Sequence, residues 1–255
     1  MKEAVYLYGK NPLKEALLSV SRGKDMPLEA IYLTKATSED PTIVSLLQKH
    51  KLTHQIVTYQ EIESMVGRDT VHQGVCARLI SDRLYTSLEE VLSQKKEGSF
   101  PLLILLDELQ DPHNVGAIIR SAVAFGATAI LLPEHDQTQL NGTVIKTAAG
   151  MSFAIPIVKI GNINTTLTKL KEAGFWTYGL DGEGDTPLHT ATFDSPTVVL
   201  IGSEGSGIRR KTLELCDFRL SIKTSSLCES LNASNAAAVV LYEWSRQQIS
   251  GPASL

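Results

Sequence analysis

Two polar residues interrupt an otherwise apolar segment of this chain and could take part in chemistry. Asn114 stands at the expected start of a helix, and Arg120 lies in its second turn near Ile118, Ile119 and Ala122. A charged side chain with such neighbours must be paired or face a cleft, because a buried unpaired charge is costly. The sequence leaves open whether Arg120 serves a ligand or is an ordinary arginine that faces solvent.

A glycine-rich loop is the second candidate. Gly202, Gly205 and Gly207 follow an apolar strand in the segment VVLIGSEGSGIRR, at 198–210. Glycines there expose backbone N–H groups and let a ligand approach the chain closely. Their order fits neither the phosphate-binding P-loop nor the dinucleotide fingerprint. Glu204 inside the loop disfavours a phosphate and favours a positively charged group. A plain tight turn is the alternative.

Polar residues also crowd the entrance of the expected last helix, 233–248. Ser230, Asn232, Ser234 and Asn235 are all present, although a single N-cap side chain suffices for a helix. The surplus indicates a ligand or a partner. A cap with local turns is the alternative.

The elements that must position these residues form an α/β pattern. The run LLILLD at 102–107 is apolar up to its last residue, which is typical of a parallel strand covered on both faces. Strands and helices alternate after it, which predicts a parallel sheet with helices on both faces. Ligands of such sheets bind beyond the carboxyl ends of the strands. Further strands are expected at 129–133, 176–180, 198–202 and 219–222.

The chain divides into two expected units. Residues 1–80 form a small α/β domain, in which Asn11 before Pro12 predicts a helix start. Residues 81–100 form a polar linker, and 101–255 form the second domain. A chain of 255 residues is long enough for one large domain or two ordinary ones.

Composition and charge restrict the class of protein. Apolar residues make up 43% of the chain and charged residues 20%, which rules out global disorder. The net charge of −4 provides no overall basic field, so a nucleic acid must be held by a local patch. No apolar run reaches the roughly 20 residues that a membrane span needs. Cys76, Cys216 and Cys228 are widely spaced and fit reduced thiols in a cytoplasmic protein, with no metal site and no disulfide.

Together, the three segments resemble the three motifs of the SpoU (TrmH) family of RNA ribose 2′-O-methyltransferases, in the SPOUT class. The pattern N-x-G-x-x-x-R occurs at Asn114, Gly116 and Arg120. The pattern I-G-S-E-G-x-G occurs at 201–207, and S-L-N-x-S occurs at 230–234. Each pattern is weak alone, whereas all three in this order and spacing are specific. The resemblance covers the whole second unit.

The first unit has a resemblance of its own. YGKNPLKEAL near the start and HQGV at 72–75 are similar to the small L30e-like substrate-binding domain of the subgroup that methylates a guanosine of large-subunit (23S) rRNA. Related enzymes that act on other rRNA sites also carry this domain. The target nucleotide therefore does not follow from it.

The resemblance implies more than the pattern of strands and helices does. It implies a parallel sheet with a C-terminal trefoil knot that binds S-adenosylmethionine, and an obligate homodimer with the last helix and the first-motif helix at its interface. Catalytic roles are implied for Asn114, Arg120, Glu204 and Asn232. Cofactor contacts are expected at Ile201, Gly202, Gly205, Ile222, Ser230 and Leu231.

The role of Arg120 is open between a general base and a positioning group. The family's arginine at this position is often considered the base that deprotonates the 2′-hydroxyl. Arginine holds its proton with a pKa above about 12, so a literal base role needs a large shift. We favour the hypothesis that Arg120 binds the target phosphate or the hydroxyl oxygen and lowers its pKa.

RNA, most directly rRNA, is the expected partner. Basic residues that could contact its phosphates are Arg78, Lys146, Arg209 and Arg210, and dimerisation would double them. Glu229 places an acid near the cofactor entrance, where it either repels RNA or contacts the sulfonium. Alternatives are the same reaction on tRNA or on an rRNA uridine, a knotted RNA-binding protein without turnover, and a generic nucleotide-binding α/β enzyme.

Overall fold

The computed structural model describes residues 4–94, 100–228 and 230–249, which form two compact units. The first contains residues up to Tyr85 together with Leu140–Ala154, and the second contains Thr86–Gln139 and the residues from Ile155 onward. This division differs from the expected boundaries. The expected linker is shared between the units, and a segment of the expected second domain packs with the first.

The first unit is built on a four-stranded sheet in the order β1-β4-β2-β3. Strand β4 is antiparallel to both β1 and β2, and β2 is parallel to β3. Helix α7 contacts β1. The strands are β1 (Tyr6–Tyr8), β2 (Leu28–Leu33), β3 (Gln55–Ile56) and β4 (Val75–Leu79). The helices are α1 (Lys10–Ser21), α2 (Lys35–Ser38), α3 (Pro41–Lys49), α4 (Tyr59–Val66), η1 (Ser81–Arg83), α7 (Gly142–Thr147) and η2 (Met151–Phe153).

Local sequence explains where these helices begin. Asp40 caps α3 through Thr42 N, with proline at the first helical position. Thr58 and Glu61 form a reciprocal capping box at α4. The expected start of α1 at Asn11 is wrong, because the helix already begins at Lys10 and its cap is a glycine with φ of 97°.

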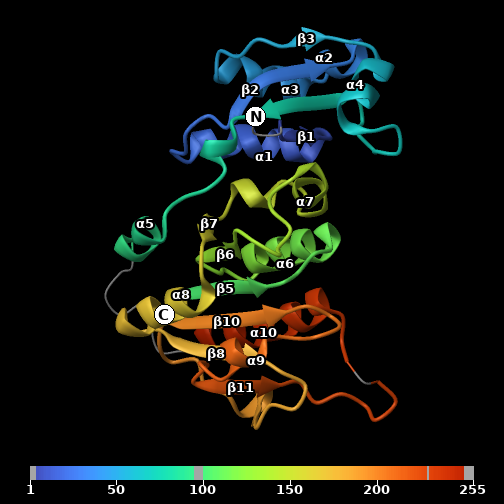
Figure 1. Ribbon diagram of the computed structural model, residues 1–255. Helices are drawn as coiled ribbons and strands as arrows, with labels where there is room; N and C mark the ends of the chain where they lie inside the picture. The colour runs from blue at the N-terminus through green and yellow to red at the C-terminus, as the bar shows by residue number, and fades with distance from the viewer. Residues whose placement is uncertain (1–3, 95–99, 229, 250–255) are drawn as a thin grey trace. The chain divides into compact units, whose positions relative to one another are not determined.

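The second unit contains a seven-stranded parallel sheet in the order β7-β6-β5-β10-β8-β11-β9 (Figure 1). This confirms the expected α/β class. The strands are β5 (Leu102–Asp107), β6 (Ala129–Pro133), β7 (Ile157–Ile160), β8 (Trp176–Leu180), β9 (Thr186–Pro187), β10 (Thr197–Gly202) and β11 (Phe218–Ser221). The helices are α5 (Leu88–Ser93), α6 (Pro112–Ala124), α8 (Ile163–Glu172), η3 (Leu188–Thr190), α9 (Arg210–Leu213) and α10 (Ala233–Ile249).

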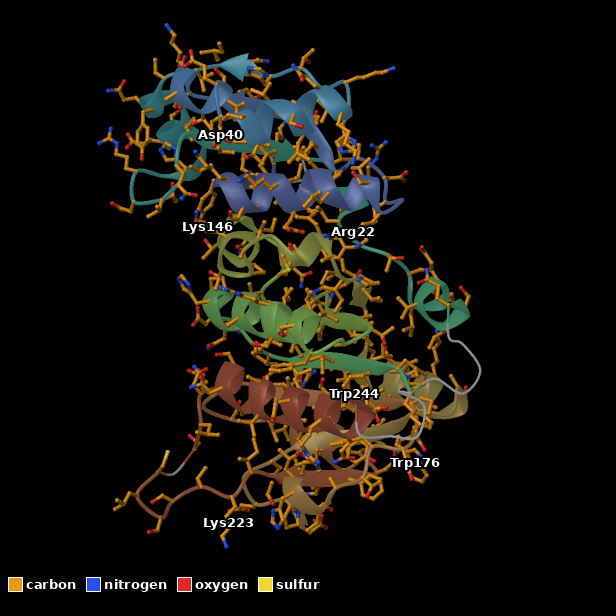
Figure 2. The ribbon with its side chains drawn as sticks, turned by 180° about the vertical axis from the view of Figure 1, so that it is seen from behind. Arg22, Asp40, Lys146, Trp176, Lys223 and Trp244 are labelled. Carbon is orange, nitrogen blue, oxygen red and sulfur yellow. The ribbon has the colours of Figure 1, made fainter. Side chains whose placement is uncertain are left out.

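Both faces of this sheet are covered, as the fully buried strand β5 requires. Leu103 and Leu105 of β5 belong to a core cluster with residues of α5 and α8. Strand alternation points Leu102, Ile104 and Leu106 to the opposite face, and all three are fully buried. Helices α6 and α10 pack against each other and lie side by side on that face (Figure 2).

Candidate active site

The register of the central strands brings two of the three candidate segments together. Gly202, at the end of β10, lies opposite Asp107, at the end of β5. Because the strands are parallel, the chain leaves both at the same edge of the sheet. Helix α6 begins shortly after β5, and α10 packs against α6, which adds the third segment.

Asn114, Glu204 and Asn232 meet there in one hydrogen-bonded network. Asn114 Nδ2 donates to Glu204 Oε1 at 2.9 Å. Asn232 Nδ2 donates to Asn114 Oδ1 at 3.0 Å and also to Glu204 Oε1. The asparagine at 114 is buried, with 9% of its surface exposed. Two amide donors on one carboxylate oxygen fix the direction of the Glu204 side chain.

Asn232 also has a structural role. Its Oδ1 accepts from Ser234 N at 2.9 Å and from Ser234 Oγ at 2.6 Å at the start of α10. The side chain therefore caps the helix with its oxygen and orients the network with its nitrogen. The two interpretations that the sequence offered for this position, cap or ligand site, are compatible.

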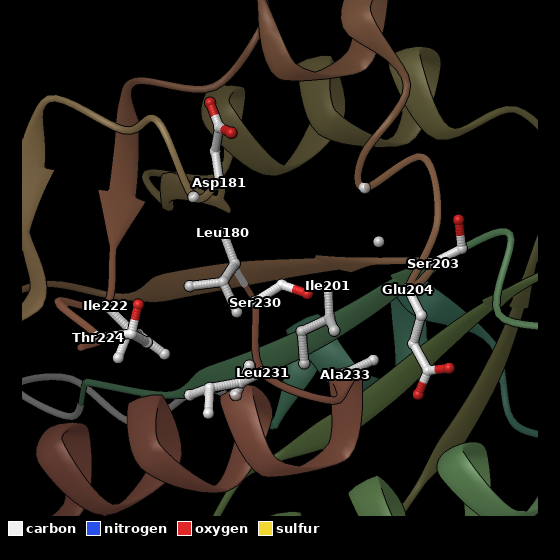
Figure 3. A pocket seen from close by; sticks show the side chains of 14 residues that line it. Leu180, Asp181, Ile201, Ser203, Glu204, Ile222, Thr224, Ser230, Leu231 and Ala233 are labelled. Carbon is white, nitrogen blue, oxygen red and sulfur yellow. The ribbon is translucent and has the colours of Figure 1, made fainter. Parts of the chain in front are cut away.

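A cavity of about 180 Å³ opens beside this network (Figure 3). Apolar Leu180, Ile201 and Leu231 group at its centre, with Asp181 on one side and Glu204 on the other. Five of the six expected cofactor contacts line it, namely Ile201, Gly202, Ile222, Ser230 and Leu231. Gly205 does not line it and faces open space.

A second cavity of about 340 Å³ adjoins the first, and the two share Ser203, Glu204 and Ala233. Asn114 lines only the second cavity. Its other lining residues are Glu108, Leu109, Gln110, Asp111 and Ser206. A ligand in one cavity and a ligand in the other would thus meet at the wall that carries Glu204.

The glycine-rich loop folds back tightly on its own strand. A Cβ on Gly202 would lie 2.1 Å from the carbonyl carbon of Gly207 and 2.2 Å from the nitrogen of Ile208. Ser203 N donates to Gly207 O at 3.1 Å, and Gly207 N donates back at 2.9 Å. Gly207 has φ of +66°, which favours glycine. The closeness of two backbones explains why this loop needs glycine at 202.

Arg120 lies apart from the network. It is exposed, lines neither cavity, and has no hydrogen bond or ion pair with any residue of the described chain. It lies six positions along the helix from Asn114, a rise of about 9 Å. A single copy of the chain therefore does not bring Arg120 to the Glu204 wall.

The four expected RNA contacts have protein partners. In the first unit, Arg78 pairs with Glu29 at 2.7 Å, and Lys146 donates to Gln73 at 3.2 Å. Burial lowers the pKa of Lys146. In the second unit, Arg209 Nη2 lies 2.8 Å from Asp107 Oδ1 and its Nη1 lies 3.3 Å from Glu108 Oε1. Arg210 pairs with Glu214 at 3.0 Å. Glu229 lies outside the described residues.

Sequence reasoning missed two acidic residues at strand ends. Asp181 follows β8 and lines the first cavity, and Asp107 ends β5 with a fully buried side chain. Each is the first charged residue after an apolar strand, which is the signal that could have identified them.

Two of the three thiols are unsuited to chemistry near neutral pH. Burial raises the pKa of Cys76 to about 12, and it raises that of Cys216 to about 12. Neither supplies an appreciable thiolate. The described residues contain no cluster of three or more His, Cys, Asp or Glu side chains that could hold a metal ion. No described helix is long and apolar enough to cross a membrane.

The fold and the site define an α/β protein with two adjoining cavities at the carboxyl ends of its parallel strands. Residues 101–242 match the model of the SpoU rRNA methylase family, and residues 6–84 match that of the RNA 2′-O ribose methyltransferase substrate-binding domain. The first match covers more than half of the chain. The chain belongs to the SpoU rRNA methylase family.

Individual relatives are similar over most of the chain. A 23S rRNA (guanosine-2′-O-)-methyltransferase of Pseudomonas syringae pv. tomato is 35% identical over 97% of this chain and 98% of its own length. An uncharacterized tRNA/rRNA methyltransferase of Synechocystis is 35% identical over 95% of this chain, which spans 62% of that relative's length. Among solved structures, the SpoU methyltransferase AviRb from Streptomyces viridochromogenes, in complex with the cofactor AdoMet, has a TM-score of 0.81 at 25% identity, covering 97% of this chain and 91% of that one.

Proposed function

We propose that this protein transfers a methyl group from S-adenosylmethionine to a ribose 2′-hydroxyl of RNA, and that the target is a guanosine of 23S rRNA. The observation that carries the proposal is the pair of cavities that share the Glu204 wall. One cavity suits a donor and the other an acceptor. The relative from Pseudomonas syringae and the AdoMet complex of AviRb support the choice of substrate and cofactor.

The first cavity fits the cofactor. Leu180, Ile201 and Leu231 offer apolar surface for a flat ring, and Glu204 and Asp181 offer negative charge for a cationic ligand. Gly202 lets the ligand approach the backbone. When bound, S-adenosylmethionine supplies an electrophilic methyl group with a good leaving group.

The hydrogen-bonded residues Asn114, Glu204 and Asn232 position the acceptor hydroxyl. Glu204 Oε1 is occupied by two amide donors, and Glu204 Oε2 has no hydrogen-bond partner among the described residues. That free oxygen can accept a hydrogen bond from a ribose 2′-hydroxyl in the second cavity, which orients the hydroxyl oxygen. It can also take up the proton that the hydroxyl loses when its oxygen is methylated. Asn114 and Asn232 hold the carboxylate in place, so that little reorganisation is needed during the reaction.

We propose that the active form is a homodimer in which α6 and α10 form the interface. Val239 and Tyr242 of α10 are 41% and 57% exposed, and Tyr242 makes an edge contact with Phe125 at 5.9 Å, just beyond α6. Arg120 is exposed on α6 without a partner in the described chain. A second copy at this face would let Arg120 act on the other copy's substrate. Arg120→Lys keeps the charge and loses the planar fork, so near-normal turnover would refute a role for Arg120 in binding phosphate or hydroxyl oxygen.

Family membership supports the remaining features of the proposal. We propose that the chain forms the trefoil knot where the segment after β11 joins α10, and that the first unit is an L30e-like domain that binds RNA. The match of residues 6–84 to the substrate-binding model supports the second point. A protein that modifies rRNA of a bacterium would act in the cytoplasm.

A comparison of 2′-O-methylation across rRNA and tRNA, in cells with and without the gene, tests the proposed function. We expect one 23S rRNA guanosine to lose its methyl group when the gene is deleted. Loss at a tRNA position or at an rRNA uridine would move the substrate to one of the alternatives. No change at any position, together with cofactor binding by the purified protein, would favour an RNA-binding protein without turnover.

A further inference from the structure

Arg209 occupies a different environment from its neighbour Arg210, although the sequence presents them as one basic cluster. The guanidinium of Arg209 bridges Asp107 and Glu108, with N–O distances of 2.8 Å and 3.3 Å. Its backbone N–H also donates to Asp107 Oδ2 at 3.1 Å. Arg210 has 91% of its side chain exposed and, among the described residues, pairs only with Glu214, four positions along the chain.

Burial makes the pairing of Asp107 necessary. The Asp107 side chain is fully buried at the end of β5, and a charge in such a place is costly unless it is paired and hydrogen-bonded. The guanidinium of Arg209 supplies the opposite charge at Asp107 Oδ1, and the backbone N–H of Arg209 supplies the hydrogen bond at Asp107 Oδ2. Removing Arg209 would leave the Asp107 carboxylate uncompensated, whereas removing Arg210 would leave only exposed groups.

The pair lies close to the base of the loop that carries Glu204. Asp107 lies opposite Gly202 in the sheet, and Gly207 and Ile208 press against Gly202 with no room for a Cβ. Ile208 is 6% exposed and belongs to the core cluster of the second unit. A shift at Arg209 must therefore move the base of the loop whose tip carries Glu204.

We propose that Arg209 and Asp107 form a positioning pair that fixes the glycine-rich loop, and that Arg209 is not an RNA contact. The pair holds Ser203 and Glu204, which form the wall between the two cavities. Glu108 extends the pair, because its carboxylate meets Nη1 of the Arg209 guanidinium. The backbone of Glu108 lies in the left-handed region, with φ of +60°. The inference rests on the proposed function, because its readouts are cofactor binding and methyl transfer.

The test measures the dissociation constant of S-adenosylmethionine by calorimetry in the absence of RNA, on the full-length protein. For Arg209→Lys, which keeps the charge but cannot bridge two carboxylates, we expect roughly tenfold weaker cofactor binding. Arg22→Lys is the matched control, since Arg22 pairs with Glu15 in the first unit, and its cofactor affinity should stay within twofold. A structural role alone would lower the melting temperature of Arg209→Lys and leave the affinity of the folded protein unchanged.

Arg209→Ala and Arg210→Ala separate a positioning role from an RNA contact. The salt dependence of RNA binding should become shallower for Arg210→Ala alone, because only an arginine that contacts phosphate releases counterions. Arg209→Ala should weaken cofactor binding, and the double variant Asp107→Asn/Arg209→Ala should bind the cofactor no more weakly than Arg209→Ala. The double variant also provides a folded protein if the lone Asp107 charge prevents folding of Arg209→Ala.

Unchanged cofactor affinity in Arg209→Lys overturns the inference. A shallower salt dependence of RNA binding in Arg209→Ala would overturn its second part, that Arg209 is not an RNA contact. The proposed function would fail in another way, since the unmodified protein would then not methylate RNA, whatever the cofactor affinity of the Arg209 variants.

Discussion

Asn232 offers the sharpest test of the site, because the oxygen and the nitrogen of its side-chain amide have different roles. Its oxygen caps α10, and its nitrogen donates to Asn114 and to Glu204. Asn232→Ser keeps an oxygen suited to an N-cap and removes the amide donor. Asn232→Ala removes both. The two substitutions therefore separate the stability of the helix from the orientation of the Glu204 carboxylate.

The structure sets the size of both effects. A hydrogen bond to a charged group contributes about 1.5–3 kcal/mol and a neutral one about 0.5–1.5 kcal/mol. If both bonds act in the transition state, their loss of about 2–4.5 kcal/mol corresponds to a fall in kcat/KM of roughly 30- to 2000-fold. Loss of a helix cap costs about 1 kcal/mol. That lowers the melting temperature by about 2–4 °C in a protein of this size.

The assay measures the transfer of tritiated methyl groups from S-adenosylmethionine to a 23S rRNA transcript, alongside thermal unfolding of the same samples. We expect Asn232→Ser and Asn232→Ala to lose similar activity, while only Asn232→Ala melts measurably lower. Near-normal turnover of Asn232→Ser would refute the reasoning. It would show that position 232 matters as a cap and that the bonds to Asn114 and Glu204 do not contribute to the reaction.

Three further predictions follow from other contacts. Glu204→Gln keeps the shape of the side chain but loses its charge, so methyl transfer should fall at least tenfold with little change in melting temperature. Turnover equal to that of the unmodified protein would show that the carboxylate has no role in the mechanism. A thiol reagent at pH 8 should label exposed Cys228 quickly. It should label Cys76 only after unfolding, because burial raises the pKa of Cys76 to about 12. Fast labelling of Cys76 in the folded protein would contradict its burial. Although burial alone would raise the pKa of Asp217, hydrogen bonds from Lys171 and Thr177 hold it below the usual range. Its contribution to stability is therefore present above the ordinary aspartate pKa of about 4 and is lost as the pH falls through the lower folded value. The difference in melting temperature between the natural protein and Asp217→Asn should therefore be constant above about pH 5 and shrink below pH 4. A difference that is undiminished at pH 3 would contradict this assignment.

Much of the candidate site follows from the sequence, because parallel strands share one functional edge. The apolar runs at 102–107 and 198–202 identify buried strands, so the polar residues that follow them must emerge at the same edge. This places Asn114 and Glu204 near each other without a structure. Asn232 joins them because α10 packs against α6.

Side-chain partnerships across the sheet are not contained in local patterns. The bond between Arg209 and Asp107 depends on β10 lying next to β5, although 102 residues separate the two in the chain. The sequence alone made Arg209 equivalent to Arg210. Likewise, Leu140–Ala154 belongs to the first unit because α7 packs against β1, which is far away in the sequence. No change of composition marks this segment.

Orientation around a helix or a loop is also not contained in local patterns. Arg120 stands near buried residues in the sequence, yet it faces solvent because the apolar stripe of α6 leaves that position outside. Gly205 lies at the exposed tip of its loop, whereas Gly202 lies at the base, where the cavity begins. Both positions belong to the family pattern, so the pattern alone could not distinguish them.

The central claim is that a methyl donor in one cavity meets a ribose hydroxyl in the other at the Glu204 wall. The most direct measurement incubates the purified protein with tritiated S-adenosylmethionine and 23S rRNA, and then digests the RNA with alkali. A methylated 2′-oxygen cannot attack the neighbouring phosphate, so the account predicts that all tritium remains in one alkali-resistant dinucleotide that begins with guanosine. Tritium in alkali-labile mononucleotides would mean that a base is methylated, and it would contradict the account.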